Sequence, residues 1–390
     1  MAFYYFSRIN VLITVLTGAS AGPVFRWRSK PAHYAGVQSC SDRSRSFFVT
    51  KILAFYNNKG GVSKTTTNFN LGVYLSQLGK RVLMVDCDPQ CNLTELFFAS
   101  REDLEDPDVQ LPGTSIYDAL LPRFKGQQGR IEQSTIEVSE HSLYSSLFLF
   151  RGDLEFSRAE TYFGTAWSQA VTENIHEKNT YIVFNKLLKD IGSQRGYDYI
   201  LCDVGPSTGA ITKTVIISCD EIVIPLVPDR FCYQAVKLLG NVISEWIESH
   251  KVISNSLKPF GIEPFEGNPK LAGTVLQNFK VHAGSKVKES YIKWQNKISE
   301  EIQSSLFKKN GFTPKEGFDI NNPYTASIKD VAVLAPVSQL FGRAIFDIQQ
   351  EHTKEASSDG RMYYGTVWQP WVDRMNEYKE EIAKIAEAIS

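Results

Sequence analysis

Short uninterrupted apolar runs, each followed by polar residues and an amphipathic stretch, recur along the chain from about residue 49. The first two runs, Ile52–Phe55 and Val82–Val85, have the length and composition of buried parallel strands. Between them, apolar residues at helical spacing predict a helix from Thr66 to Leu78 that ends at Gly79. Strands that alternate with helices in this way predict an α/β fold, a mostly parallel twisted sheet flanked by helices on both faces.

The same alternation continues to the end of the chain. Further strands are expected at residues 147–150, 197–203, 221–228 and 271–278, and helices at residues 115–121, 181–191, 235–246 and 368–389. The last of these helices contains several glutamates among few cations. This composition argues against a basic membrane anchor and favours a helix that packs on the core.

The most informative polar segment joins the first strand to the first helix and reads Asn57-Asn58-Lys59-Gly60-Gly61-Val62-Ser63-Lys64-Thr65-Thr66. A strand, a glycine-containing loop, Lys-Thr and a helix form the arrangement whose backbone N–H groups face the phosphates of a nucleotide. In this pattern Lys64 reaches the outer phosphates and the Thr65 hydroxyl ligates Mg²⁺. The competing interpretation is a glycine turn without a ligand, but strand, loop and helix occur in the required order.

Two positions depart from the ordinary phosphate-loop pattern, which has glycine six residues before the lysine and again directly before it. Asn58 and Ser63 occupy these places. Asparagine tolerates a left-handed backbone better than most residues, so the change at Asn58 is mild. Ser63 is expected to be strained if its position requires a positive φ.

Acidic residues follow two of the expected strands. Asp86 and Asp88 come at the end of the second strand, and Asp203 ends the strand that begins near Tyr197. Ligands of open α/β sheets bind at the carboxyl ends of the strands. Asp203 is therefore expected to orient Mg²⁺ through water, and the Gly205-Pro206 turn behind it to respond to the γ-phosphate.

The motif Lys-Gly-Gly-Val-x-Lys-Thr-Thr, with an extra lysine at position 59, resembles the deviant phosphate loop of the ParA/MinD (Soj-like) ATPases, and most of all the ParA-type partition ATPases. The resemblance implies a P-loop NTPase fold that binds ATP and Mg²⁺ between two identical subunits. Lys59 of one subunit would then reach the phosphates held by the other. In this family glycine usually follows Pro-Gln, where Cys91 stands, and proline usually occupies the position of Gly205.

The same resemblance assigns roles to individual residues. Asp88 would position the attacking water, Asp86 would support the Mg²⁺ shell, and Asn278 at a strand end would contact adenine, although an exposed turn asparagine explains Asn278 nearly as well. The expected catalytic residues are Lys59, Lys64 and Asp88, and the expected metal residues are Thr65, Asp86 and Asp203. The expected nucleotide contacts are Lys59, Gly60, Gly61, Val62, Ser63, Lys64, Thr65, Thr66 and Asn278.

Lysines gather in one segment directly after the strand expected at residues 271–278. Lys280, Lys286, Lys288 and Lys293 lie there with one acid, Glu289. A basic face of this kind binds nucleic-acid backbone or is a solvated helix face, and the sequence favours neither. ParA-type proteins bind DNA nonspecifically near this region. They usually also carry arginine in the later segment ending in Ala-Pro, where residues 328–336 offer only Lys329.

Residues 1–48 differ in composition from the rest, with six basic residues and one acid. An apolar run followed by Ala19-Ser20-Ala21 resembles an export signal, and the scarcity of acids resembles an organelle transit peptide. We favour a disordered or wrongly assigned extension, which leaves residues 49–390 as the ATPase domain. That domain contains 36 basic and 42 acidic residues, so any DNA contact requires a local patch.

Three functions follow as hypotheses. The first is a ParA-type ATPase, slow alone and accelerated by a ParB-like or other partner, which times nonspecific DNA binding in plasmid or chromosome partition. The second is a nucleotide-gated protein-positioning or regulatory switch that does not bind DNA. The third, metallocluster chemistry, would need paired cysteines on facing loops, and the six cysteines show no such spacing. The first two place the protein in the cytoplasm, on the nucleoid if it binds DNA, as a homodimer away from membranes.

Overall fold

A computed structural model describes residues 49–106, 109–279 and 286–390 of the chain. Within these residues, eight strands form one sheet in the order β3-β4-β2-β5-β1-β6-β7-β8. The strands are β1 (Lys51–Phe55), β2 (Val82–Asp86), β3 (Ser139–Glu140), β4 (Leu147–Phe150), β5 (Tyr199–Asp203), β6 (Glu221–Leu226), β7 (Lys270–Phe279) and β8 (Tyr324–Lys329). The short β3 runs antiparallel to β4, and every other neighbouring pair is parallel. The extension expected at residues 1–48 lies outside the described residues.

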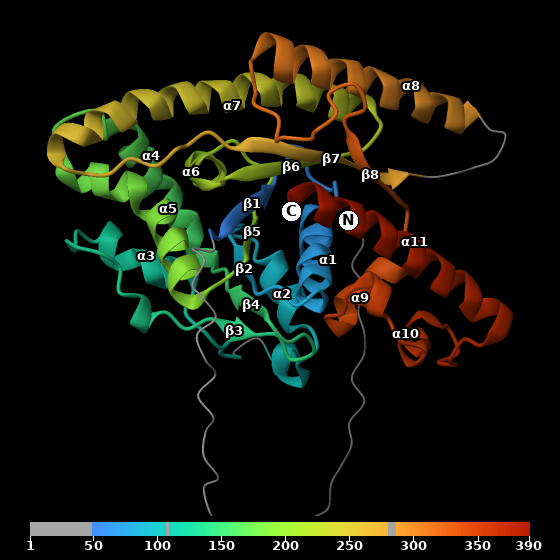
Figure 1. The fold of residues 1–390 in the computed structure, drawn as a ribbon. Helices are drawn as coiled ribbons and strands as arrows, with labels where there is room; N and C mark the ends of the chain where they lie inside the picture. The colour runs from blue at the N-terminus through green and yellow to red at the C-terminus, as the bar shows by residue number, and fades with distance from the viewer. Residues whose placement is uncertain (1–48, 107–108, 280–285) are drawn as a thin grey trace, which may run out of the picture. The chain divides into compact units, whose positions relative to one another are not determined.

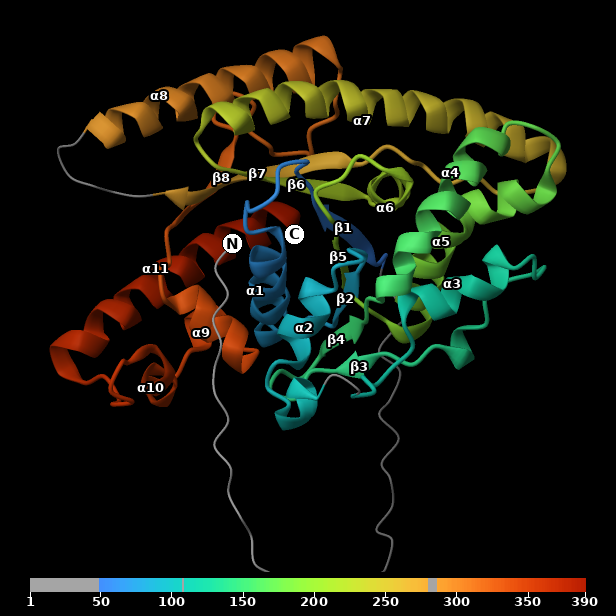
Figure 2. The ribbon, with the colours of Figure 1, turned by 180° about the vertical axis from the view of Figure 1, so that it is seen from behind.

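Helices cover both faces of this sheet (Figures 1 and 2). They are α1 (Lys64–Gln77), α2 (Asn92–Phe98), α3 (Ile116–Phe124), α4 (Ala159–Gln169), α5 (Ile175–Arg195), α6 (Ala210–Ser218), α7 (Arg230–Leu257), α8 (Lys286–Glu301), α9 (Leu334–Phe341), α10 (Thr353–Ala356) and α11 (Gly365–Ile389). A π-helical segment, Ile302–Lys309, continues α8. The expected α/β architecture with helices on both faces is confirmed.

Two hydrophobic cores hold the layers together. One face of the sheet packs against α3 to α8, with Phe163, Phe184 and Leu239 among its buried residues. The other face packs against α1, α2, α9 and α11. Because the central strands are covered on both faces, they read as apolar runs instead of alternating, up to the aspartate that ends each of β2 and β5.

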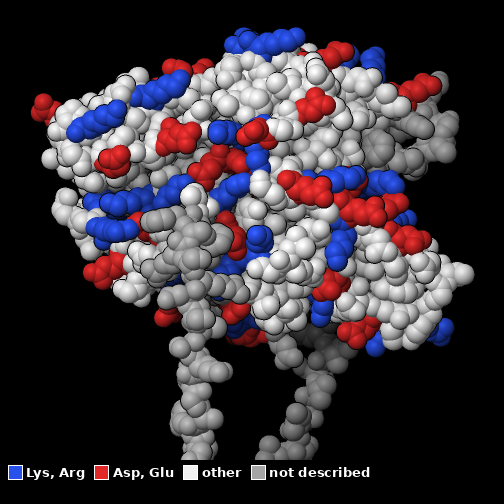
Figure 3. Space-filling model, viewed as in Figure 1, with Lys and Arg blue, Asp and Glu red and all other residues white. Residues whose placement is uncertain are grey.

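The C-terminal helix α11 packs on the core as expected. Trp371, Tyr378, Ile382 and Ile385 are buried against α1 and the sheet, while acidic side chains gather on the exposed side of the helix (Figure 3). Within the described residues, no helix is both long enough and apolar enough to cross a bilayer.

Candidate functional site

The expected polar residues lie together at the carboxyl edge of the central strands. In the parallel register Asp86 of β2 lies opposite Asp203 of β5, and Phe55 at the end of β1 lies on the other side of Asp203. The chain leaves β1 at this edge and forms the loop that leads into α1. Sequence segments more than a hundred residues apart therefore converge on the first turn of α1.

The loop before α1 contains two residues with left-handed backbone. Gly61 has φ 71°, and Ser63, at the N-cap of α1, has φ 57° and ψ 32°. The strain expected at Ser63 is thus present, and such a conformation costs a non-glycine residue about 1–3 kcal/mol. Cys91, at the N-cap of α2, has φ 57° as well. Asn58 does not use a positive φ.

Lys64, the first residue of α1, is buried with its ammonium against the loop. Its ammonium donates to the carbonyl oxygens of Asn57 at 3.2 Å and Lys59 at 3.4 Å. Burial lowers the pKa of Lys64, and the nearby carboxylates of Asp203 and Asp88 oppose that shift. Because its hydrogen bonds to the described residues go to neutral carbonyl groups, the positive charge of Lys64 remains available to an anion on the loop.

Thr65 and Asp203 form the contact expected of a cation site. The Thr65 hydroxyl donates to Oδ2 of Asp203 at 2.6 Å, and Oδ1 of Asp203 is buried with no hydrogen-bond donor among the described residues. Burial, and then the charge of Asp86, raise the pKa of Asp203 to about 8. A hydroxyl beside a buried oxygen without a donor fits Mg²⁺, which binds few protein groups and keeps several waters.

Asp86 is held by its own chain. Its Oδ2 accepts from the backbone N–H of Thr94 at 2.8 Å and from the Thr94 hydroxyl at 2.6 Å, and its Oδ1 accepts from the N–H of Asp88 at 3.2 Å. Burial raises the pKa of Asp86 to about 6, against these hydrogen bonds. Through these hydrogen bonds Asp86 fixes the loop after β2. Its expected support of Mg²⁺ stays a prediction.

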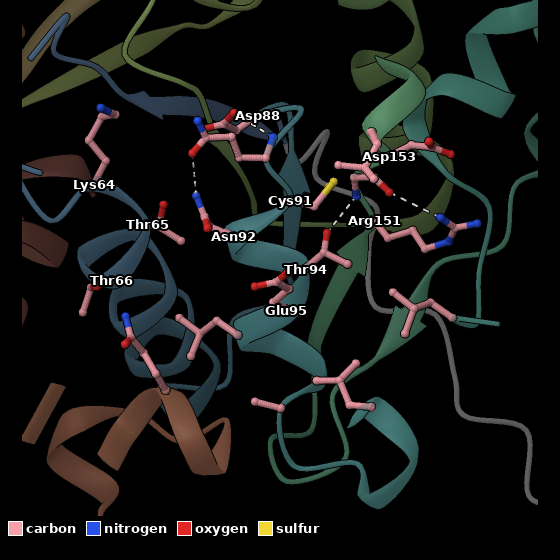
Figure 4. A pocket seen from close by; sticks show the side chains of 18 of the residues that line it. Lys64, Thr65, Thr66, Asp88, Cys91, Asn92, Thr94, Glu95, Arg151 and Asp153 are labelled. Carbon is pink, nitrogen blue, oxygen red and sulfur yellow. Dashed lines mark hydrogen bonds between the residues drawn. The ribbon is translucent and has the colours of Figure 1, made fainter. Parts of the chain in front are cut away.

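Asp88 lies at the edge of the cleft in front of the loop. Its Oδ1 accepts from the N–H of Gln90 at 3.0 Å, and 9% of the residue's surface is exposed. Figure 4 shows Asp88, Lys64 and Thr65 around the same space, with Asp88 on the side of α2. One carboxylate oxygen is thus fixed while the group still reaches the cleft, as a residue that binds water at a reacting group requires.

The side chain of Lys59, an expected site residue, points away from the phosphate loop. Its ammonium forms an ion pair with Asp229, whose other oxygen caps α7 by accepting from the N–H of Cys232 at 2.8 Å. The backbone of Lys59 is fixed by the side chain of Asn57, which also donates to the carbonyl of Pro225 at 2.7 Å. Within one subunit, Lys59 therefore contacts the N-terminus of α7 through its side chain.

A cleft of about 1170 Å³ opens in front of the loop. Its walls contain the expected residues 60–66 and Asp88, and also the polar residue Gln90. Further polar residues that the sequence pattern does not single out line it as well, among them Asn92, Glu95, Arg151 and Asp153 (Figure 4). The volume is sufficient for a nucleotide. Of these additional residues, Arg151 and Asp153 had a signal in the sequence, because they follow the expected strand at residues 147–150 directly.

The remaining expected residues are Asn278, Lys280, Lys286, Lys288 and Lys293. Lys280 lies outside the described residues, Asn278 belongs to β7, and Lys286 and Lys288 belong to α8, but the side chains of these three are not described. Lys293 is exposed on α8. Among the described residues, no group of three or more His, Cys, Asp or Glu side chains is arranged as a metal site.

Comparison with known proteins finds sequence relatives among the partition ATPases. A family model described as an AAA domain matches residues 50–258, more than half of the chain. The chain is 28% identical over 256 residues to the chromosome-partitioning ATPase Soj of Treponema pallidum, covering 66% of this chain and 88% of that protein. It is 26% identical over 250 residues to the sporulation initiation inhibitor protein Soj of Bacillus subtilis, covering 64% and 87%.

Solved structures with the same fold include protein DIP2308 from Corynebacterium diphtheriae, with a TM-score of 0.59 and 22% identity over 75% of this chain and 97% of that one. A complex of a Cyanothece McdA variant with ATP has a TM-score of 0.52 and 20% identity, with coverage of 87% and 96%. At such identity the likeness concerns the fold, and it confirms the expected P-loop NTPase architecture.

Proposed function

This chain belongs to the AAA domain family, within it to the ParA/MinD ATPases, and we propose that it dimerises on ATP and hydrolyses it to time its binding to DNA and a partner protein. One observation carries the proposal. The Thr65–Asp203 hydrogen bond lies beside the buried ammonium of Lys64, at the N-terminus of a helix behind a glycine loop. These are the groups needed to hold a triphosphate with its cation.

In the proposed reaction, water attacks the γ-phosphorus of ATP, the bond to the β,γ-bridging oxygen breaks, and ADP and phosphate leave. Backbone N–H groups of residues 60–65 and the Lys64 ammonium hold the phosphates in line. The Asp88 carboxylate accepts a hydrogen bond from the water and orients it. Thr65 and Asp203 would hold Mg²⁺, which when bound neutralises charge on the phosphate oxygens.

The dimer part of the proposal gives Lys59 a second position. It pairs with Asp229 within its own subunit, and in a dimer it would reach the phosphates held by the partner subunit. Both side chains of the pair are partly exposed, so the ion pair is weak and can be exchanged at little cost. Leu154 and Leu340 line the cleft and expose apolar side chains that a second subunit could cover.

The ion pair predicts the effect of Asp229→Asn. Asparagine can still cap α7 but no longer offers Lys59 a negative charge, so dimerisation with a non-hydrolysable ATP analogue is expected to tighten roughly two- to fivefold. Sedimentation velocity across a range of protein concentrations measures this. Asp190→Asn, which breaks the ion pair with Arg130, is the matched control and should leave dimerisation unchanged. Equal dimerisation of Asp229→Asn and wild type would exclude competition for Lys59.

The DNA part of the proposal depends on the lysines of α8 and the segment before it. Changing Lys286, Lys288 and Lys293 to glutamate is expected to abolish ATP-dependent retention on DNA at low salt, because three positive charges that would contact phosphates become negative charges that repel them. Each lost phosphate contact also reduces the slope of log K against log[salt] by about 0.9. A matched variant changes three exposed lysines elsewhere, Lys125, Lys354 and Lys379, to glutamate. Equal retention of the two variants would remove α8 from the DNA surface.

A second function, a nucleotide-gated switch that positions a protein without DNA, is favoured by one observation. Lys329, the only basic residue of the segment where ParA-type proteins usually carry arginine, forms an ion pair with Glu377 at 2.9 Å. Its charge is therefore partly neutralised within the chain. Co-sedimentation with ATP, with DNA added or omitted, tests both functions: pelleting that requires DNA supports the first, and ATP-dependent dimers that ignore DNA support the second.

A further inference from the structure

We propose that Gly205, in the turn after β5, is a positioning residue for Asp88, because its missing side chain lets the Asp88 carboxylate rest against the turn. The inference rests on the proposed function, since it takes Asp88 as the group that orients the attacking water. It concerns a residue at which the chain departs from the proline usual in its family.

The contact is close and involves the whole carboxylate. A Cβ atom added to Gly205 would lie 3.2 Å from Cγ, from Oδ1 and from Oδ2 of Asp88. Three equal distances mean that the flat face of the carboxylate, and not one oxygen, lies over the α-carbon of Gly205. At this distance a side chain at position 205 would require Asp88 to move by a few tenths of an ångström.

Backbone conformation does not account for the glycine. Gly205 is not among the residues with positive φ, in contrast to Gly61 or Gly196, so other residues could adopt its backbone. The feature that distinguishes position 205 is the space over its α-carbon, and Asp88 fills that space.

Asp88 has little freedom to move away. Its Oδ1 is tied to the N–H of Gln90 at 3.0 Å, and the residue is nine-tenths buried. Among the described residues, no hydrogen bond is made to its Oδ2, so this atom remains available to water. The N–H of Gln90 on one side and the backbone of Gly205 on the other therefore determine where that oxygen points.

Asp86 provides a comparison within the same loop. It also lies against a glycine, since a Cβ at Gly152 would lie 3.0 Å from its Cγ and Oδ2. Both oxygens of Asp86 are already bonded to Thr94 and to the backbone of Asp88. Gly152 therefore makes room for a carboxylate that serves the loop, whereas Gly205 makes room for one with an oxygen left for a ligand.

The position of Gly205 gives the contact a second consequence. The turn directly follows Asp203, whose carboxylate is bonded to Thr65 of the phosphate loop. The contact between Gly205 and Asp88 thus joins the turn after β5 to the loop after β2. A shift of the turn would move the Asp88 carboxylate with it, so water is aligned only when the turn is in place.

The test is Gly205→Ala. Displacing Asp88 by a few tenths of an ångström is expected to lower turnover at saturating ATP roughly four- to tenfold, by scaling from about a hundredfold for 1 Å. The ATP dissociation constant should stay within about twofold of wild type, because Asp88 acts in the reaction and not in phosphate binding. Gly164→Ala is the matched control, since its Cβ would lie 3.9 Å from the nearest atom.

A double variant separates positioning from general damage. In an Asp88→Asn background, Gly205→Ala should cause no further loss of turnover, because both changes act through one carboxylate. A further loss equal to that in the wild-type background would overturn the proposal, and so would wild-type turnover of Gly205→Ala. Thermal unfolding and an ATP dissociation constant within about twofold of wild type together show that Gly205→Ala is folded, so that its loss of turnover does not come from unfolding.

Failure of the proposed function has a different signature. If Asp88→Asn hydrolyses ATP as fast as wild type, the role of Asp88 is wrong, and the positioning role of Gly205 falls with it. If Asp88→Asn is slow and Gly205→Ala is as fast as wild type, the proposed function stands and only the inference about Gly205 is overturned.

Discussion

Lys64→Ala is expected to abolish ATP binding at the concentrations where the wild-type protein is saturated. The ammonium of Lys64 is buried against the phosphate loop, where it donates to two loop carbonyls. Each hydrogen bond from a charged donor to a phosphate is worth about 1.5–3 kcal/mol. Losing two such bonds between Lys64 and the phosphates of ATP therefore weakens ATP binding by at least about a hundredfold. Titration with a fluorescent ATP analogue measures the change.

The stability of this variant distinguishes lost function from lost fold. Burial lowers the pKa of Lys64, which means that holding the charged amine inside the loop opposes folding. The Lys64→Ala protein should therefore unfold at a temperature no lower than the wild type without ligand. Lys80→Ala, at an exposed lysine after the same helix, is the control and should bind ATP normally. Unchanged affinity in Lys64→Ala would remove the loop from the nucleotide site.

Asp88→Ala is expected to keep ATP but stop hydrolysis. A positioned group that orients or deprotonates water contributes about 10²–10⁴ to the rate, and the carboxylate of Asp88 faces the cleft in front of Lys64 and Thr65 (Figure 4). The variant should accumulate as an ATP-bound dimer. Phosphate release measured beside sedimentation in ATP tests both statements together.

The control for Asp88→Ala is Asp373→Ala, which removes an exposed carboxylate of α11 that bonds to Gln369. It should hydrolyse ATP at the wild-type rate. Rapid multiple turnover by Asp88→Ala would contradict the assignment, and loss of ATP binding would show that Asp88 serves the phosphates rather than the water.

Most of the strands that the structure describes could be predicted, because the central strands are buried on both faces and read as plain apolar runs. The strands that lead to Lys64, Asp86 and Asp203 are of this kind, and the structure has each of them within a few residues of the expected bounds. β8 was missed because its residues, Tyr324–Lys329, mix polar and apolar types at a sheet edge. The apolar residues of the π-helical segment after α8 have no periodicity from which this segment could be predicted.

The sequence by itself determined the phosphate loop, its helix and the acids at the strand ends, because these depend on neighbours in the chain and because parallel strands end at one edge of a sheet. Only the tertiary structure decided what each side chain touches. Lys59 forms an ion pair with Asp229, which lies 170 residues away in the chain. The carboxylate of Asp88 packs against Gly205 in the turn that follows β5. Such contacts follow from the packing of distant elements, on which spacing within one segment carries no information.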